Sequence, residues 1–394
     1  MKPLVLLFVA LFNSILGLSI LFPILGPLGR ELGLSELQVG TLTTVYSLAQ
    51  FVMSPYWGRR SEVVGRKPVL LRGILGFGLT FLLFGVLAQL GTWGLLRGMP
   101  LFLALLASRI VGGALSAATL PTAQAYVADV TARDQRTSGM ALIGAAFGLA
   151  VVFGPALGAL LAPFGLLVPV YVSAAIAFLN AAFVWLRLPE PPSRTASETP
   201  PDLLPVASKV WVILAVGFAT TLASVSMEQT VAFYFQDRLK LSTGEAAQTV
   251  GYALVLYGLV VVLVQGVFVR RVRWSPLRLL RVGVPITAGG LCTFALAHAA
   301  PTLMIGLLLQ GLGQALAMPG VTAALSLSVR DAEQGAVAGL NSSSQALGRT
   351  LGPVLGTGLY QLAPASPYVF GAALLVLVML FLLSSRSVAL NAGT

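Results

Sequence analysis

Three charged side chains lie deep within apolar stretches of this 394-residue chain, where an ionised group is costly. They are Arg109 in SRIVGGALSAA, Glu228 in ASVSMEQTVAFYF and Arg349 in SSSQALGRTLGP. Burial favours a neutral carboxyl, whereas a nearby arginine favours the carboxylate, so an acid and an arginine that move relative to each other can load and release a proton. The three residues therefore predict proton handling. The alternative is a static ion pair that holds helices in register.

The composition identifies the solvent of the folded chain as a lipid bilayer. Hydrophobic residues make up 57% of the chain, charged residues only 9%, and the mean hydropathy is +0.91. Such values lie outside the range of soluble globular domains. The single cysteine, Cys292, excludes a disulfide framework, and one histidine with no nucleotide loop or Ser-His-Asp set argues against an enzyme.

Twelve runs are long and apolar enough to span a bilayer, which predicts an all-α membrane protein with 12 transmembrane helices. The first run continues to Pro27, too far for a signal peptide, and is read as a retained span. The spans are approximately 4–28, 38–57, 70–92, 100–127, 139–162, 167–187, 209–235, 246–268, 279–299, 301–327, 336–360 and 366–384.

The net charge of +11 follows from topology rather than from a nucleic-acid partner. With both termini in the cytoplasm, 18 of the 24 lysines and arginines fall on the cytoplasmic side, as the positive-inside rule requires. We therefore expect a multi-pass protein of the cell (inner) membrane, with the lipid bilayer as its surroundings, no nucleic acid partner and a monomeric state.

The spans divide six and six around one polar, proline-rich stretch. We predict an N-terminal six-helix bundle over residues 1–187, a cytoplasmic linker over 188–208 and a C-terminal six-helix bundle over 209–394. GPALG at 154–158 and GPVLG at 352–356 are separated by 352 − 154 = 198 residues. Pro121 and Pro319 share this offset, and so do Gly113 and Gly311. The common offset predicts two pseudo-symmetric halves.

Arg109 and Glu228 are predicted at nearly the same depth in their spans. Arg109 lies 127 − 109 = 18 residues from the cytoplasmic end of its span, and Glu228 lies 228 − 209 = 19 residues from that of its own. The two could face each other between the halves. Arg349 could instead pair with Glu228, screen a substrate anion or bind carbonyls at a helix end.

The loop after the second span reads GRRSEVVGRKPVLL over residues 58–71 and carries five charges. It resembles the loop signature of the major facilitator superfamily in Gly58, Glu62, Gly65, Arg66 and Lys67, with Glu62 in place of the usual Asp. The resemblance implies that Glu62 pairs with Arg66 and Asp129 and acts as a conformational switch that stabilises the outward-facing state. A solvated topology signal is the alternative.

The fifth span contains GAAFGLAVVFGPALGALL over residues 144–161. It resembles the motif of proton-driven antiporters of that superfamily in the residues Gly144, Gly148, Gly154, Pro155 and Gly158. Two expected glycines are replaced by Ala150 and Ala159. Small residues at this spacing make a flat surface for helix packing, which is also the alternative without antiport.

Nearly the whole chain resembles the twelve-span drug:proton antiporter branch, including tetracycline-efflux relatives. The resemblance implies the major facilitator fold and a proton-coupled antiporter for multidrug or metabolite efflux, driven by the proton gradient without a cofactor or metal. Rocker-switch alternating access would carry a small-molecule substrate, with protons returning in exchange. One acid and two arginines leave neutral, zwitterionic or anionic substrates open.

Polar residues predicted to face the central cavity could equally bridge helices. They are Asn13, Tyr46, Gln50, Gln124, Tyr126, Gln229, Tyr234, Gln310, Gln314 and Asn341, together with Arg349. The main alternative function is a lipid or glycolipid translocator, or another metabolite carrier, on the same fold. A receptor derived from a carrier would retain the two repeated halves. A channel would need a continuous line of polar side chains through the membrane.

Overall fold

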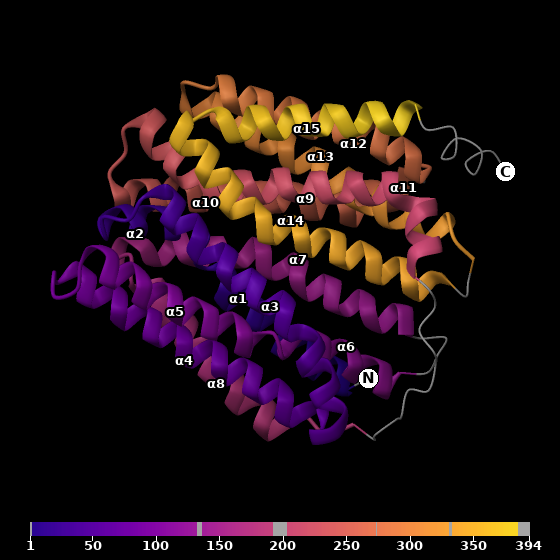
Figure 1. Ribbon diagram of the computed structural model, residues 1–394, viewed down its shortest axis with the longest axis horizontal. Helices are drawn as coiled ribbons and strands as arrows, with labels where there is room; N and C mark the ends of the chain where they lie inside the picture. Colours follow the sequence, from indigo (N-terminus) through magenta and orange to yellow (C-terminus); the bar gives the residue numbers. More distant parts are fainter. Residues whose placement is uncertain (1, 132–135, 192–202, 273, 331–332, 385–394) are drawn as a thin grey trace. The chain divides into compact units, whose positions relative to one another are not determined.

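The computed structural model describes residues 2–131, 136–191, 203–272, 274–330 and 333–384, and all regular structure within these ranges is helical. Each predicted span corresponds to one helix or to one interrupted helix (Figure 1). Nine helical segments of the described ranges are long and apolar enough to cross a membrane. The apolar part of the first helix is shorter, and the second and eleventh spans carry polar side chains. The prediction of an all-α membrane protein is confirmed.

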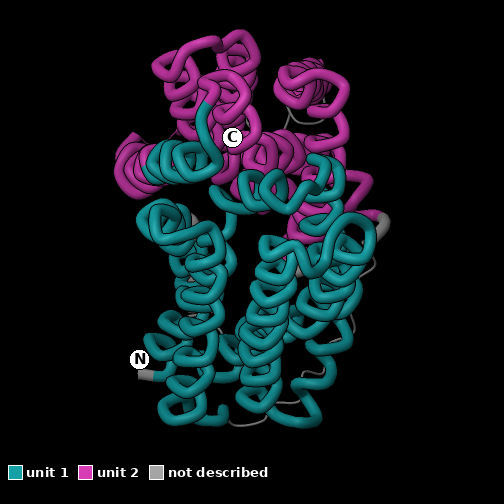
Figure 2. Tube along the Cα trace, turned by 90° about the vertical axis from the view of Figure 1, so that its left-hand side faces the viewer, with its two compact units in different colours: residues 1–197, 241–255 teal, residues 198–240, 256–394 magenta. Residues whose placement is uncertain are grey.

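Contacts divide the chain into two compact units, coloured separately in Figure 2. Unit 1 is Met1–Ser197 with Leu241–Val255, and unit 2 is Glu198–Lys240 with Leu256–Thr394. The break near residue 197 falls within the predicted linker. The first half of the eighth span contacts unit 1, which the predicted six-and-six division does not anticipate.

The described residues of unit 1 form eight α-helices and the start of a ninth. They are α1 (Lys2–Ser19), α2 (Leu25–Glu31), α3 (Glu36–Val64), α4 (Arg66–Thr92), α5 (Gly98–Ser116), α6 (Thr119–Val130), α7 (Arg136–Leu161), α8 (Val168–Arg187) and the first part of α10 (Thr243–Leu263), with the short 3-10 helix Ala162–Phe164 after α7.

Two spans predicted as continuous are interrupted in unit 1. The first breaks between Ser19 and Leu25, where Pro23 lacks a backbone N–H and disfavours helical geometry at the residue before it. The fourth breaks at Ala117 and Ala118, and Pro121 follows in the first turn of α6. Proline therefore accounts for the position of both interruptions.

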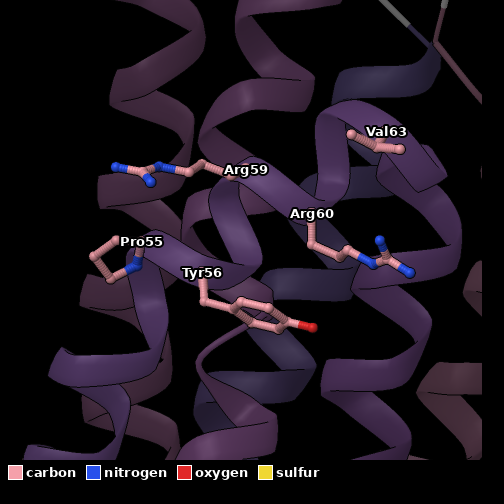
Figure 3. A pocket seen from close by; sticks show the side chains of 5 residues that line it. All are labelled: Pro55, Tyr56, Arg59, Arg60 and Val63. Carbon is pink, nitrogen blue, oxygen red and sulfur yellow. The ribbon is translucent and has the colours of Figure 1, made fainter.

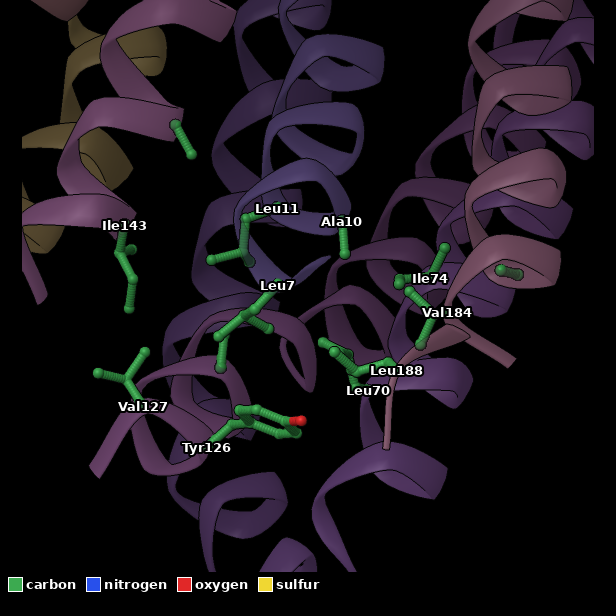
Figure 4. Close-up of a cluster of buried hydrophobic side chains, with 13 residues drawn as sticks. Leu7, Ala10, Leu11, Leu70, Ile74, Tyr126, Val127, Ile143, Val184 and Leu188 are labelled. Carbon is green, nitrogen blue, oxygen red and sulfur yellow. The ribbon is translucent and has the colours of Figure 1, made fainter. Parts of the chain in front are cut away.

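The core of unit 1 brings α1, α4, α6, α7 and α8 together around buried apolar side chains (Figure 4). Leu7 and Leu11 from α1 lie beside Tyr126 and Val127 from α6, all nearly inaccessible to solvent. This core fixes the inner end of α6 against α4 and so positions the charged groups described below.

Unit 2 contains α9 (Leu203–Leu239), the end of α10 with a π-helical turn at Val264–Phe268, α11 (Val269–Val272), α12 (Pro276–Leu296), α13 (Ala300–Leu327), α14 (Gln334–Leu362) and α15 (Ser366–Ser384). Four glycines, at 283 and 290 on α12 and at 306 and 313 on α13, allow these two helices to pack backbone to backbone. A Cβ atom added at Gly313 would lie 2.6 Å from the carbonyl oxygen of Gly283. This is the small-residue packing typical of membrane helices.

Candidate functional site

A buried ion pair lies where α3 turns into α4. Nε of Arg66 donates to Oδ2 of Asp129 at 2.8 Å, and Nη1 of Arg66 donates to the hydroxyl of Ser61 at 2.7 Å. Gly65, between the two helices, has φ +105°, a conformation that side chains with a Cβ rarely adopt. Arg66 and Asp129, each predicted to pair with Glu62, are therefore paired directly with each other.

The expected role of Glu62 in this cluster is not observed. The Glu62 side chain is exposed, and no hydrogen bond or ion pair joins it to the described part of the chain. Its neighbour Ser61 is buried and faces Arg66 instead. On a helix, adjacent residues point about 100° apart, so an acidic residue at 62 cannot share the direction of Ser61.

Glu190, which sequence reasoning assigned to an unstructured linker, completes the cluster. Its carboxylate accepts hydrogen bonds from the backbone N–H groups of Arg66 and of Lys67, the latter at 2.9 Å. These donors belong to the first turn of α4, which has no side-chain cap of its own. The hydroxyl of Tyr126 donates to the carbonyl of Pro189 at 2.8 Å and holds the preceding residue in place. The only sequence signal was an acid directly after the last apolar run of the N-terminal half.

The same end of α3 carries an open hollow lined by Pro55, Tyr56, Arg59, Arg60 and Val63 (Figure 3). Arg59 and Arg60 extend from the helix in different directions and are both exposed. A Cβ atom added at Gly58, on the same turn, would lie 3.8 Å from Cβ of Pro121 on α6, which is an ordinary van der Waals contact. The hollow is thus part of the charged loop motif.

Arg109 on α5 is enclosed by aromatic rings in unit 1. Its guanidinium carbon lies 4.5 Å from the ring centre of Phe84, 5.1 Å from that of Phe81 and 5.5 Å from that of Tyr46. The residue is only 4% exposed, and its buried Nε has no hydrogen-bond partner in the described part of the chain. Cation–π attraction is worth about 2 kcal/mol or more at a desolvated site, so the rings stabilise the charge without neutralising it.

A short polar chain leads away from the Arg109 cage. The hydroxyls of Tyr46 and Ser116 lie 2.8 Å apart, and Nε2 of Gln50 donates to the same serine oxygen at 3.1 Å. Ser116 is the last residue of α5, directly before the interruption of the fourth span. Two predicted cavity residues, Tyr46 and Gln50, are therefore joined through a serine that sequence reasoning did not single out.

Glu228 lies on α9 of unit 2, and Arg349 on α14 is the cation that acts on its carboxyl electrostatically. The hydroxyl of Tyr257 on α10 lies within electrostatic range of the same carboxyl. The side chains of Glu228 and Arg349 form no hydrogen bond or ion pair with each other in the described part of the chain, and Glu228 is half-buried while Arg349 is exposed. The predicted pairing with Arg109 would join the two units and stays a prediction.

One helical turn before Glu228, Ser224 begins a hydrogen-bonded network. Oε1 of Gln314 accepts from Ser224 at 2.5 Å, from Tyr257 at 2.8 Å and from Nε2 of Gln310 at 3.1 Å. Gln310 also donates to Ser224 at 2.8 Å, while its own buried Oε1 has no partner among the described residues. The network brings the predicted Gln310 and Gln314 together beside Glu228 and leaves one acceptor available.

The antiporter-like motif on α7 packs against the interrupted first span. A Cβ atom at Gly154 would clash with Ser19, and one at Gly158 would lie 2.5 Å from the carbonyl oxygen of Ile20. Gly251 of α10 fits in the same way against Ala159, next to Pro155. Gly144 and Gly148 have no neighbour within 4 Å of a Cβ. Two of the four motif glycines, Gly154 and Gly158, therefore pack tightly within unit 1, and the other two have no such contacts.

The remaining candidates divide between structural and unassigned positions. The hydroxyl of Tyr234 donates to the carbonyl of Ala295 at 2.9 Å, and the hydroxyl of Tyr126 donates to the carbonyl of Pro189. Both tyrosines therefore have a structural role. Asn341 accepts from Gln345 at 3.1 Å, and Gln124 is exposed. Asn13 and Gln229 are partly buried. No group of three or more possible metal ligands occurs in the described ranges.

Comparison with known proteins gives consistent results across sequence and structure. The family model of the Major Facilitator Superfamily matches residues 7–300 and 247–392. The chain is 27% identical over 384 residues to Multidrug resistance protein 2 of Bacillus subtilis, covering 93% of this chain and 90% of that one. It is 28% identical over 381 residues to the class C tetracycline resistance protein of Escherichia coli, covering 91% and 90%. The crystal structure of a human organic anion transporter matches with a TM-score of 0.68 at 24% identity, covering 97% and 99%.

Proposed function

Because the chain belongs to the Major Facilitator Superfamily, we propose that it is a proton-coupled antiporter that exports small amphipathic compounds by alternating access. Its sequence relatives include proteins named for multidrug and tetracycline resistance. The observation that carries the coupling is the half-buried carboxyl of Glu228 in a candidate membrane-spanning helix, with Arg349 acting on it electrostatically and a polar network one helical turn away.

Glu228 is the proton carrier in this proposal. An interior carboxylate far from water favours its protonated form, and a nearby guanidinium favours the ionised form. A helix movement that changes the separation of Glu228 and Arg349 therefore changes the proton affinity of the site. Arg109, if it faces Glu228 in one state of the cycle, has the same effect. The proton gradient supplies the driving force, and no cofactor is needed.

The loop cluster acts as the conformational switch. Arg66, Asp129 and Ser61 form a buried hydrogen-bonded group, and Glu190 joins the start of the linker to the first turn of α4. Such a group stabilises whichever state of the transporter contains it, so breaking the group shifts the population of states. The excess of arginine and lysine in this loop supports a position on the cytoplasmic side of the cell membrane.

The proposal is tested by following proton movement in everted membrane vesicles. Vesicles with an acidic lumen and a pH-sensitive dye are exposed to matched cationic, neutral and anionic amphipathic compounds. At least one compound is expected to release protons from wild-type vesicles and from Glu245→Gln vesicles, because Glu245 is an exposed carboxylate at the start of α10. Glu228→Gln should abolish the response.

Two results would contradict the proposal. If no compound moves protons through the wild type, the protein is not a proton antiporter for these substrates, and a lipid or glycolipid translocator becomes the better account. If Glu228→Gln responds like the wild type, coupling exists but Glu228 does not carry the proton.

A further inference from the structure

Unit 1 holds a buried positive charge that none of its described side chains neutralises. Arg109 is only 4% exposed, and its buried Nε has no hydrogen-bond partner in the described part of the chain. Glu228 and Arg349 belong to unit 2, where Glu228 is half-buried and Arg349 is exposed. An unneutralised buried charge is expensive, so Arg109 requires an anion from elsewhere.

The acids in the described part of unit 1 do not supply that anion. Asp129 is engaged by Arg66, Glu36 by Arg30, and Glu190 by the first turn of α4. Glu31, Glu62 and Glu245 are exposed at helix ends. Among the described residues of unit 1, therefore, none of these carboxylates neutralises Arg109.

From this balance we infer that the exported compound is an amphipathic organic carboxylate whose anionic group binds the guanidinium of Arg109. The inference rests on the proposed transport function and specifies its substrate class. Arginine presents a planar donor edge that matches a carboxylate with two parallel hydrogen bonds. A cation would add to a site that already has excess positive charge.

The rings around Arg109 determine what the rest of the compound can be. Phe81, Phe84 and Tyr46 cover the guanidinium and make the surroundings apolar. A low local dielectric strengthens a charge-assisted hydrogen bond to an arriving carboxylate. An aromatic or aliphatic body suits the same surroundings, while the polar chain through Ser116 to Gln50 offers a hydrogen-bonding group for one further polar substituent.

Binding to the purified full-length protein in lipid nanodiscs tests the inference with three probes of one shape. They are 2-naphthoxyacetate, its neutral primary amide, and the matching trimethylammonium compound, each measured by titration calorimetry against empty nanodiscs. The wild type should bind the carboxylate about tenfold or more tighter than the amide, the difference expected for one hydrogen bond to a charged group. The cation should bind weakest.

Variants locate the preference for the carboxylate. Arg109→Gln should bind the carboxylate and the amide about equally, and Arg109→Lys should keep only part of the preference because an ammonium lacks the planar fork. The matched control is Arg278→Gln, since Arg278 also lies over an aromatic ring, 4.7 Å from that of Trp274, but is exposed. It should retain the wild-type preference. If Arg109→Gln does not fold, Arg109→Lys together with the wild-type probe series decides the question.

Three outcomes would overturn the inference. They are equal or tighter binding of the amide or the cation by the wild type, an undiminished carboxylate preference in the Arg109 variants, and loss of that preference in Arg349→Gln instead. Each of these outcomes overturns the substrate class alone, and the proposed antiport stands if vesicles still release protons in response to a compound of another charge. Failure of the substrate class and failure of the coupling are thus distinguishable.

Discussion

Replacing Glu190 by alanine removes the carboxylate that accepts the backbone N–H groups of Arg66 and Lys67. The first turn of α4 would then lose its cap, because Gly65 at the N-cap position offers no side chain. We expect Glu190→Ala to destabilise unit 1, although Glu190 lies just beyond the last predicted span of the N-terminal half.

The size of the effect follows from capping energetics. Loss of an N-cap acceptor costs about 0.5–2 kcal/mol, and loss of a negative charge at a helix N-terminus costs about 0.3–1 kcal/mol. The sum is about 1–3 kcal/mol. For a unit of this size, each kcal/mol lowers the melting temperature by about 2–4 °C. The expected decrease is therefore about 2–12 °C.

Thermal unfolding followed by tryptophan fluorescence measures this decrease, and Glu62→Ala is the matched control. Glu62 is an exposed acid of the same loop motif without a partner in the described ranges, so its replacement should change the free energy of unfolding by less than about 0.5 kcal/mol. Equal decreases for both variants, or a larger one for Glu62→Ala, would refute the assignment of the anchoring role to Glu190.

Three further predictions use the same unfolding assay. Gly313→Ala should cost about 1–3 kcal/mol because its Cβ meets the α12 backbone, whereas Gly289→Ala, with open space around it, should be neutral or slightly stabilising. Asp129→Asn should cost about 3–5 kcal/mol, since it leaves the buried charge of its arginine partner unpaired; a cost below 1 kcal/mol would contradict the buried pair. The Arg330 side chain, which donates to the carboxylate of Glu333, lowers the pKa of Glu333 from 4.5 to about 2. The stabilisation by Glu333 should therefore be complete above pH 4.5 and decline as the pH falls toward 2, so the melting temperatures of wild type and Glu333→Gln should converge with acidification; a constant difference would contradict this pKa shift.

The positions of the helices could be predicted from the sequence because a bilayer imposes a simple requirement. A span needs about 20 apolar residues, and every predicted span overlaps a helical segment. Hydropathy does not report where a helix breaks within an apolar run. The interruptions after Ser19 and Ser116 were therefore missed, although Pro23 and Pro121 mark them in retrospect.

The candidate site could be predicted in part. Arg66 and Asp129 were identified as members of the cluster because charge is rare and conspicuous in this chain, but their direct contact was not predicted. The choice between Ser61 and Glu62 depends on the rotation of α3 about its axis, which an indistinct apolar pattern at its end does not define. The cap by Glu190 depends on a contact across 124 residues of sequence, and no local pattern reports such a contact.

The partners of the interior charges were the hardest to predict, because depth along a helix does not determine which neighbour a side chain meets. Arg109 and Glu228 have similar predicted depths, yet the structure encloses the first in aromatic rings and sets a polar network of Ser224, Gln310 and Gln314 one helical turn from the second. Three rings at suitable spacing on two other helices gave no signal that distinguishes them from ordinary packing residues.

The most direct test of the central claim is proton release when substrate binds to the purified protein. The protein is placed in weakly buffered solution with a pH-sensitive dye, and the compound with the largest response in vesicles is added at saturation. If Glu228 carries the exchanged proton, the wild type should release up to about one proton per molecule and Glu228→Gln should release none. Equal release from both proteins, or none from a wild type that binds the compound, would contradict the account.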